Sequence, residues 1–364
     1  MYIMWPDLLQ PSPPSFITLP CIGLDISDTS LKYISFTGEK NGNRTIEQYG
    51  DITIPNGVLH RGEVMDPQKL ADVLIECKEQ TGAEYVRVSL PEERAYLFET
   101  ELKRSTPLKE MRSLLEFRLS ENVPIPAQDV FFDYTALPVS DESDRVIHVA
   151  VTAYARETIQ TYYEACLLAK LQPLAFEVEA QAMARAVIPT ESSEAVMLVD
   201  FGKTRTGIGI VYKNTLLYTS TIDIGGDQLS TALRKQLGDD VAEKELTRLK
   251  NTEGLVHGAQ SSEVHDALMT TMSVVKDELL TRMQYWHLRT GSDEQRRLNK
   301  IILCGGSANL KGLPAYLTET VGITTVRANV WENTFSFDEI VPPIDKRHSL
   351  GYATAVGLAL PANT

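Results

Sequence analysis

The sequence predicts an α/β protein built as two packed units. Strand and helix patterns alternate along the chain, and its 364 residues are too many for one ordinary domain of ~100–200 residues. A run of three short strands also occurs twice, at residues 22–54 and again at residues 196–224. With 43% hydrophobic and 23% charged residues, the chain can bury a sizeable core and does not have the composition of a disordered protein.

The first unit is predicted to start with three strands and to continue with a helix. Asp66 and Pro67 form a helix start, in which the aspartate caps the first turn, and the helix is expected to run to Gly82. The expected strands of this part lie at residues 22–26, 31–36, 45–54, 85–90 and 95–102.

Residues 103–173 are predicted to form an inserted module of helix, strand, strand and helix. Thr106 and Pro107 repeat the capping signal, and the amphipathic helix that they begin ends before Pro124. The strands are expected at residues 131–137 and 146–154, and the second helix at residues 157–171.

The second unit is predicted to repeat the three opening strands and then to become helical. The segment 176–187, which leads into it, has a helical pattern at its end. The other expected strands lie at residues 196–201, 207–212, 216–224 and 301–303. Helices are expected at residues 228–237, 241–250, 263–289 and 350–360, and one more is expected to follow the glycine turn after residue 303 and to run to residue 321.

Charge and composition exclude several function classes. The 35 basic and 49 acidic residues give a net charge of −14, which repels nucleic acid and anionic lipid. The four cysteines lie far apart, so neither a disulfide framework nor a zinc site is expected, and a reducing cytoplasm fits best. No stretch approaches the ~20 apolar residues that span a bilayer. The apolar start of the chain has no basic residue, so no secretory signal is expected.

Two predicted hairpins each carry an aspartate at the end of their first strand. Asp25 is followed by a hydroxyl-rich turn to Ser30, and Asp200 by a turn through Thr204 to Thr206. One such turn alone is usually only a hydrogen-bonded turn. Two copies in separate halves of the chain could face each other and enclose a triphosphate, with the turns donating hydrogen bonds and the carboxylates holding the waters of a Mg²⁺ ion.

Two glycine pairs, Gly225-Gly226 and Gly305-Gly306, each lie between a strand and a helix. Such turns let the backbone approach a ligand closely, and the second pair suits a flat ring. The first pair could also be only a flexible cap. Glu179, just before an alanine-rich helix, could orient a water for attack on a phosphate, or it could simply interact with the helix dipole.

Motifs of other enzyme classes are absent from the sequence. The hydrolase elbow GxSxG is not satisfied, because Asn309 stands where the closing glycine should be. Neither a Walker loop nor a GxGxxG opening occurs. The six histidines have no metal-ligand spacing, so each is expected to be an ordinary surface or core residue.

The order and spacing of these turns resemble the superfamily of actin, sugar kinases and chaperone ATPases. Within it the chain is similar to the PilM family, the actin-like assembly proteins of type IV pili, which are related to the division protein FtsA. The resemblance covers about residues 21–360 and implies two actin-like (ribonuclease H-like) lobes around a nucleotide cleft. It is carried by Gly23-Leu24-Asp25-Ile26, Val199-Asp200-Phe201-Gly202, Gly225-Gly226-Asp227 and Cys304-Gly305-Gly306-Ser307.

The resemblance also implies ATP and Mg²⁺ as cofactors. Asp25 and Asp200 would hold the metal through water, and Glu179 would position the attacking water. The chain departs from the family at Ser27, where glycine is usual, and at Leu246, which breaks an Ala-Glu-x-x-Lys pattern. The residues implied to bind the nucleotide are Asp25, Ser27, Ser30, Lys32, Asp200, Gly202, Thr204, Thr206, Gly225, Gly226, Asp227, Glu243, Gly305, Gly306 and Ser307.

The implied partner is the cytoplasmic N-terminal tail of a PilN-like inner-membrane protein, bound between the inserted module and the first lobe. The chain would then be cytoplasmic and reach the inner membrane only through this partner; self-association is a further option, and no nucleic acid is expected.

The resemblance also implies a division of the chain into domains. These are an arm at 1–20, a first lobe at 21–102 and 174–192, the inserted subdomain at 103–173, a second lobe at 193–345 with a helical part at about 228–290, and a closing helix at 346–364.

The arm suggests a hypothesis of its own. Asp7-Leu8-Leu9-Gln10-Pro11 resembles an element of PilN tails, so the arm could occupy the partner groove of its own or a neighbouring molecule. A disordered proline-rich end is the other reading of these residues.

Two alternatives to a pilus scaffold remain at this point. An FtsA-like division protein would carry a C-terminal amphipathic membrane helix, and the chain stops just after the predicted closing helix. An active ATPase or a sugar kinase of the same superfamily is the other alternative, although no aspartate stands out as the general base that a kinase needs. The leading prediction is a nucleotide-gated scaffold with at most slow ATP hydrolysis.

Overall fold

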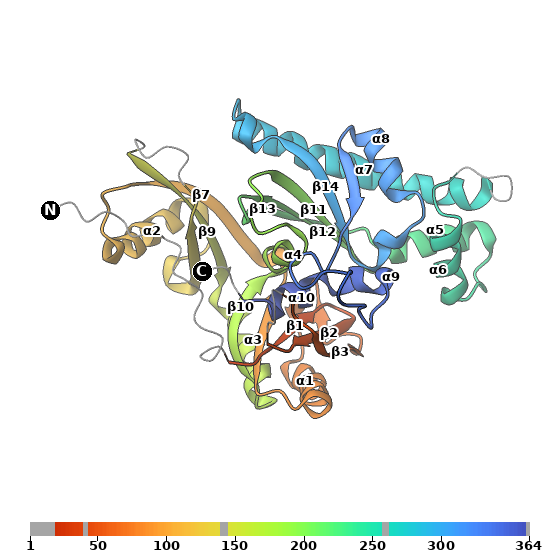
Figure 1. Cartoon of the computed structure of the whole chain (residues 1–364), viewed down its shortest axis with the longest axis horizontal. Coiled ribbons are helices and arrows are strands. Elements are labelled where there is room, and N and C mark those ends of the chain that lie inside the picture. Colours follow the sequence, from red (N-terminus) through yellow and green to blue (C-terminus); the bar gives the residue numbers. More distant parts are fainter. Residues whose placement is uncertain (1–18, 39–42, 139–144, 257–261, 362–364) are drawn as a thin grey trace.

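A computed structural model describes residues 19–38, 43–138, 145–256 and 262–361 of the chain (Figure 1). The segment 7–11, for which groove binding was hypothesised, lies outside the described residues. The two units appear as two five-stranded sheets with their helices, and a smaller three-stranded sheet stands beside them (Figure 1).

The first five-stranded sheet has the order β10-β6-β1-β2-β3. The predicted meander is confirmed, since β1, β2 and β3 pair antiparallel in sequence order, while β6 and β10 are parallel to β1. Asp66 caps α1 as predicted, because its carboxylate accepts the Lys69 N–H at 3.1 Å. The bounds are β1 (Ile22–Ile26), β2 (Ser30–Phe36), β3 (Ile46–Thr53), β6 (Tyr85–Leu90), β10 (Gln172–Val178) and α1 (Pro67–Thr81), with a small hairpin of β4 (Leu59–His60) and β5 (Glu63–Val64).

The second five-stranded sheet repeats this plan in the order β13-β12-β11-β14-β15. Its first three strands again form an antiparallel meander, and β14 and β15 add in parallel. The bounds are β11 (Ala195–Phe201), β12 (Thr206–Tyr212), β13 (Thr215–Ile222), β14 (Leu298–Cys304), β15 (Thr324–Arg327), α5 (Gly226–Leu237), α6 (Glu243–Thr252), α7 (Ser262–Thr290) and α8 (Leu313–Val321).

The third sheet, β7-β9-β8, carries α2 and has a hydrophobic cluster of its own, centred on Met111, Leu115 and Leu119. Thr106 was predicted to cap α2, which is wrong: the helix starts at Leu108 and has no side-chain cap. The bounds are β7 (Ala95–Lys103), α2 (Leu108–Asn122), β8 (Val130–Ala136), β9 (Val146–Ala155) and α3 (Arg156–Leu168).

The hydrogen bonding of this sheet crosses the division predicted at residue 103. β7 lies before that point and pairs with β9 along its whole length. α3 lies before the division predicted at residue 173 and contacts α1 of the first unit. The strand β7 also reaches the second unit, because Glu99 pairs with Arg289 at 3.0 Å and with Arg296 at 2.6 Å.

Two short helices, α4 and α10, pack against each other where the two five-stranded sheets meet (Figure 1). They pack closely because Gly357 of α10 has no side chain: a Cβ there would lie 1.6 Å from the carbonyl oxygen of Ala182. The remaining bounds are α4 (Glu179–Val187), α9 (Lys346–Ser349), α10 (Ala353–Ala359), η2 (Glu92–Arg94), η3 (Ala127–Asp129), η4 (Glu294–Arg296), η5 (Gly306–Asn309) and η6 (Leu350–Tyr352).

Candidate functional site

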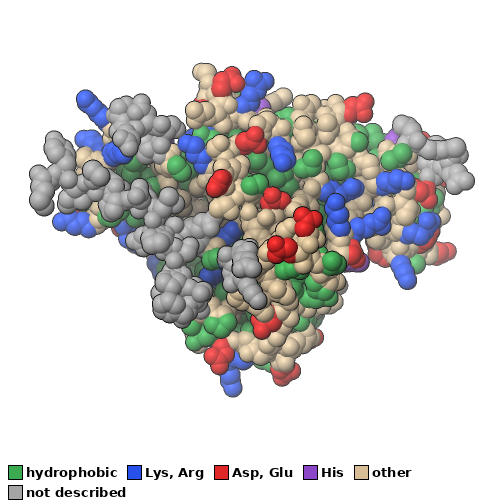
Figure 2. All heavy atoms as spheres, in the orientation of Figure 1, with side chains coloured by type: hydrophobic (Ala, Val, Ile, Leu, Met, Phe, Trp, Pro, Cys, Tyr) green, Lys and Arg blue, Asp and Glu red, His purple; other side chains and the backbone are tan. Residues whose placement is uncertain are grey.

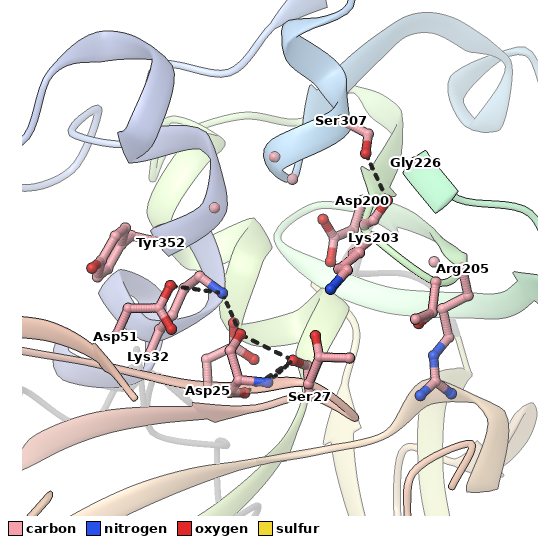
Figure 3. Close-up of a pocket in the computed structure, with 18 of the residues that line it drawn as sticks. Asp25, Ser27, Lys32, Asp51, Asp200, Lys203, Arg205, Gly226, Ser307 and Tyr352 are labelled. Atoms are coloured by element: carbon pink, nitrogen blue, oxygen red, sulfur yellow. Dashed lines mark hydrogen bonds and ion pairs between the residues drawn. The ribbon is translucent and has the colours of Figure 1, made fainter. Parts of the chain in front are cut away.

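A cavity of about 1160 Å³ is lined by residues of both units. It brings together all the predicted site residues except Thr206 and Gly225. Asp25 and Asp200 lie across it from each other, at the ends of β1 and β11, as the two-hairpin prediction requires (Figure 3). The side chain of Glu179, at the start of α4, lines the same cavity.

The first hairpin turn is held by its own hydroxyls. The Ser27 hydroxyl donates to the carbonyl oxygen of Ser30 at 2.9 Å and accepts the Ser30 N–H at 3.2 Å. Lys32 donates to the Ser30 hydroxyl at 2.7 Å and lies 3.7 Å from Asp51. The turn beside Asp25 is therefore held in one conformation by its own hydrogen bonds, with the ammonium group of Lys32 next to it (Figure 3).

The second hairpin turn is held by the two glycine turns. The carbonyl oxygen of Gly202 accepts the Gly226 N–H at 3.0 Å and the Ser307 hydroxyl at 2.8 Å. The carbonyl oxygen of Lys203 accepts the Asp227 N–H at 2.9 Å. Three motifs that are distant in the sequence are thus joined through backbone atoms of one turn.

Thr206 and Gly225 do not line the cavity and support the turns from behind. The Thr206 side chain is fully buried, and its hydroxyl donates to the carbonyl oxygen of Ile224 at 2.6 Å. A Cβ at Gly225 would lie 2.5 Å from the carbonyl oxygen of Lys203, so this glycine permits a close backbone approach. Both residues shape the site without facing it.

Three carboxyl groups in the cavity, those of Asp25, Asp200 and Glu179, have raised pKa values. Burial raises the pKa of Asp25, and burial together with the charge of Asp25 raises the pKa of Asp200 to about 7. Burial raises the pKa of Glu179 well above its usual range, and the neighbouring acids Glu92, Asp25 and Asp200 add to this effect. The cavity therefore has an excess of negative groups that a bound cation would stabilise.

A magnesium ion fits this donor set if most of its ligands are water and phosphate. No group of three or more His, Cys, Asp or Glu side chains that could hold a metal occurs in the described part of the chain. Asp25 and Asp200, on opposite walls of the cavity, are consistent with Mg²⁺ coordination. This ion usually keeps several water ligands and binds few protein groups together with phosphates.

The glycine at position 305 brings the backbone close to Asp200. Gly305 has a φ of 85°, a left-handed conformation that favours glycine. A Cβ there would lie 2.3 Å from a carboxylate oxygen of Asp200. The flat surface predicted for this turn is consequently next to the end of the second hairpin that carries Asp200.

The chain matches the family described as type IV pilus assembly protein PilM over residues 23–363. It belongs to the PilM family. This match confirms the predicted resemblance and does not favour the division-protein or sugar-kinase alternatives. Among the described residues, no helix has the length and apolar character needed to cross a membrane.

Solved structures confirm the actin-like fold. A PilM–PilN type IV pilus biogenesis complex matches with a TM-score of 0.74 at 22% identity, over 94% of this chain and 98% of that one. MreB5 of Spiroplasma citri bound to ADP matches with a TM-score of 0.52 at 14% identity, over 87% of this chain and 93% of that one. The cell shape-determining protein MreB of Escherichia coli (strain K12) is 25% identical over 168 residues, 39% of this chain and 48% of MreB, so the chain spans about half the length of the curated relatives it matches.

Sequence reasoning missed a lysine that lines the site in this PilM-family chain. Leu246 breaks the expected pattern after Glu243, but Lys250, two helical turns further along α6, lies 3.6 Å from Glu243. Lys250 also donates to the Ser230 hydroxyl at 2.7 Å and to the carbonyl oxygen of Gly226 at 3.2 Å. The spacing of seven residues on a helix was the signal that could have found it.

A second missed feature is an ion-pair cluster that joins the two hairpins. Arg205, in the second turn, pairs with Asp28 in the first turn and with Glu93 of η2. The carboxylate of Asp28 also accepts the backbone N–H groups of Arg61 and Gly62 at 3.1 and 3.0 Å. Because its members come from distant parts of the chain, the sequence alone contains no signal for this pairing.

Glu92 provides a test of the buried charge in the cavity. Its side chain is 3% exposed, and burial, together with the charge of Asp200, raises the pKa of Glu92 to about 8 from an ordinary value of 4.5. The folded protein then binds one more proton than the unfolded chain between these pH values, so the free energy of unfolding falls as the pH rises from about 4.5 to about 8.

The variant Glu92→Gln is expected to remove most of this loss. It keeps the shape of the side chain but has no charge, so it should be more stable than the parent at pH 8 by roughly 2–4 kcal/mol and close to the parent at pH 5. Urea unfolding at both pH values measures this, with the exposed Glu79→Gln as a control for the substitution. Equal pH profiles of Glu92→Gln and parent would contradict the assignment.

Proposed function

We propose that the chain is an ATP-binding scaffold for type IV pilus assembly, which binds Mg²⁺-ATP between its two lobes and the N-terminal tail of a PilN-like membrane protein on its inserted module. The observation that carries the proposal is the pair of carboxylate-tipped hairpins, Asp25 and Asp200, across one cavity in a PilM-family chain. The partner would keep the protein at the inner face of the inner membrane.

Several features support nucleotide binding. The serine and glycine turns line the cavity, and Lys32 and Lys250 lie among them. Lys and Arg side chains also gather around α6 and α9, beside the cavity, on the right-hand side of Figure 2. In a chain of net charge −14, these cationic side chains would partly offset the carboxylates of the cavity when a polyphosphate binds. An MreB5 structure with ADP shows that this fold accommodates a nucleotide in a relative.

Slow hydrolysis follows from the environment of Glu179. A general base must be ionised to take a proton from water, and burial raises the pKa of Glu179 well above its usual range. A metal ion in the cavity would lower it again, because a positive charge nearby favours the carboxylate. We therefore assign Glu179 to water positioning only in the loaded state, and Mg²⁺ supplies the charge that the phosphates need.

The inserted module is the proposed partner-binding unit. It has its own sheet and hydrophobic cluster, and the outer side of α2 exposes Leu108, Leu114 and Phe117. α3, beside the first lobe, exposes Tyr163 and Leu167. Apolar side chains on these two helices would line a groove between module and lobe, and exposed apolar surface of this kind is typical of peptide-binding sites. The solved PilM–PilN complex shows that a PilM of this fold binds PilN.

A titration with the partner tail tests the proposal. We expect a fluorescent peptide of the N-terminal tail of the cognate PilN-like protein to bind the full chain saturably, and its affinity to change by at least about 3-fold when Mg²⁺-AMPPNP is present, because a ligand that prefers one lobe arrangement biases the groove. Phe117→Ser and Leu167→Ser should each weaken the peptide about 10-fold. Phe337→Ser, exposed on another segment, is the control. Absence of saturable binding would refute the partner assignment.

A further inference from the structure

The second hairpin places one lysine, Lys203, at its tip, and the side chain of this residue has no role in the site described so far. Lys203 lines the cavity, and its side chain extends into the space between the two hairpins, beside Asp200 and facing the turn of Ser27 (Figure 3). Its ammonium group forms no hydrogen bond or ion pair with any residue that the structure describes.

The other cationic groups near the hairpins already have partners. Lys32 donates to Ser30, and Lys250 donates to Ser230 and lies beside Glu243. Arg205, two residues after Lys203 in the same turn, pairs with Asp28 and Glu93. Two cationic side chains of this turn, Lys203 and Arg205, thus line the cavity. Protein carboxylates neutralise Arg205, whereas no carboxylate of the described residues neutralises Lys203.

Hydrogen bonds hold the backbone of Lys203 in place, whereas none holds the side chain of Lys203 among the described residues. The carbonyl oxygens of Gly202 and Lys203 accept hydrogen bonds from Gly226, Ser307 and Asp227, at 2.8 to 3.0 Å. A side chain on a fixed turn, directed into a cavity and without a protein partner, is positioned for a ligand, because little ordering of the backbone is needed when the ligand binds.

The position within the cavity indicates which part of a ligand Lys203 would meet. If the flat backbone of Gly305 and Gly306 holds the base, the phosphates would extend from there toward the hairpins, and the last phosphate would lie between the hairpin tips. Asp25 and Asp200 repel that phosphate unless cations compensate for them. A lysine is a point charge with three donors, which suits a terminal phosphate.

We propose that Lys203 binds the terminal phosphate of a nucleoside triphosphate and thereby makes the cleft prefer the triphosphate over the diphosphate. This inference rests on the proposed function, because it requires that a nucleotide binds. Lys203 acts here as a specificity-determining residue, and the second hairpin is the element through which loss of the terminal phosphate would be sensed.

Calorimetric titration of the full chain with Mg²⁺-AMPPNP and with Mg²⁺-ADP tests it. The parent is expected to bind AMPPNP more tightly than ADP. Lys203→Gln is expected to lose 10- to 100-fold in affinity for AMPPNP, the range of a hydrogen bond to a charged group, and less than about 3-fold for ADP. Lys203→Arg should keep most of the preference, and the exposed Lys235→Gln, outside the cavity, should behave as the parent.

The possible failures are distinguishable. If the parent binds neither nucleotide, the proposed function and this inference are both wrong. If the parent binds both nucleotides but Lys203→Gln weakens them equally, or weakens neither, nucleotide binding stands and the assignment of Lys203 to the terminal phosphate is wrong.

Discussion

Replacing Asp200 with alanine is expected to weaken the binding of Mg²⁺-ATP about 100-fold. Asp200 lies across the cavity from Asp25, and together they are the two carboxylates that would hold the waters of the metal. Losing an interaction with a charged group costs roughly 1.5–3 kcal/mol, which corresponds to a factor of about 10 to 150 in affinity. Calorimetric titration of parent and variant measures the effect.

The same variant should not be destabilised at neutral pH, which separates lost binding from lost folding. Burial and Asp25 raise the pKa of Asp200 to about 7, so its ionised form opposes folding when no cation is present. At pH 8, Asp200→Ala is therefore expected to unfold at a urea concentration no lower than the parent does. Asp239→Ala, exposed and outside the cavity, is the matched control. Equal Mg²⁺-ATP binding by Asp200→Ala and parent would contradict the assignment of Asp200 and the second hairpin to the nucleotide site.

Replacing Gly357 with alanine is expected to destabilise the whole protein by at least about 3 kcal/mol. The added methyl group would lie 1.6 Å from the carbonyl oxygen of Ala182 and 2.4 Å from its carbonyl carbon. These are backbone atoms of α4, so the two helices must separate, and overpacking of this kind costs 1–3 kcal/mol or more. Urea unfolding measures the loss, which should appear as a lower midpoint.

Gly351→Ala provides the comparison in the same closing segment. Its methyl group would meet only the Cε atom of Lys32, at 3.6 Å, which is an ordinary contact. We expect its free energy of unfolding, measured by urea unfolding, to stay within about 0.5 kcal/mol of that of the parent. A Gly357→Ala variant as stable as Gly351→Ala would show that α4 and α10 do not pack as closely as the structure has them.

Local patterns were sufficient to predict most of the elements and most of the candidate residues that line the cavity. The hairpins carrying Asp25 and Asp200 could be predicted because strand alternation and a polar turn are both local in the sequence. The strand β10 was missed, because Pro173 and an irregularity between Pro173 and Ala175 interrupt its alternation. The side chain of Thr206 was placed in the site, whereas strand geometry turns it inward, where it is fully buried.

The pairings across the cleft could not be predicted, for a physical reason. Arg205 and Asp28 meet only because two separate sheets bring their hairpins together, and the sequence carries no information about that distance. Lys250 could have been found from helical spacing, since it follows Glu243 by two turns of one helix. The domain boundaries at residues 103 and 173 remain proposals, because β7 pairs with the inserted strands and α3 packs on the first unit.

The strand β7 and the short helix η2 before it are attached at two points to the second unit. Glu93 of η2, just before β7, forms an ion pair with Arg205 of the second hairpin, and Glu99 within β7 forms ion pairs with Arg289 and Arg296. Any rotation of the second lobe must therefore either break these ion pairs or carry the three-stranded sheet with it. While these ion pairs hold, the three-stranded sheet follows the second lobe and not the first.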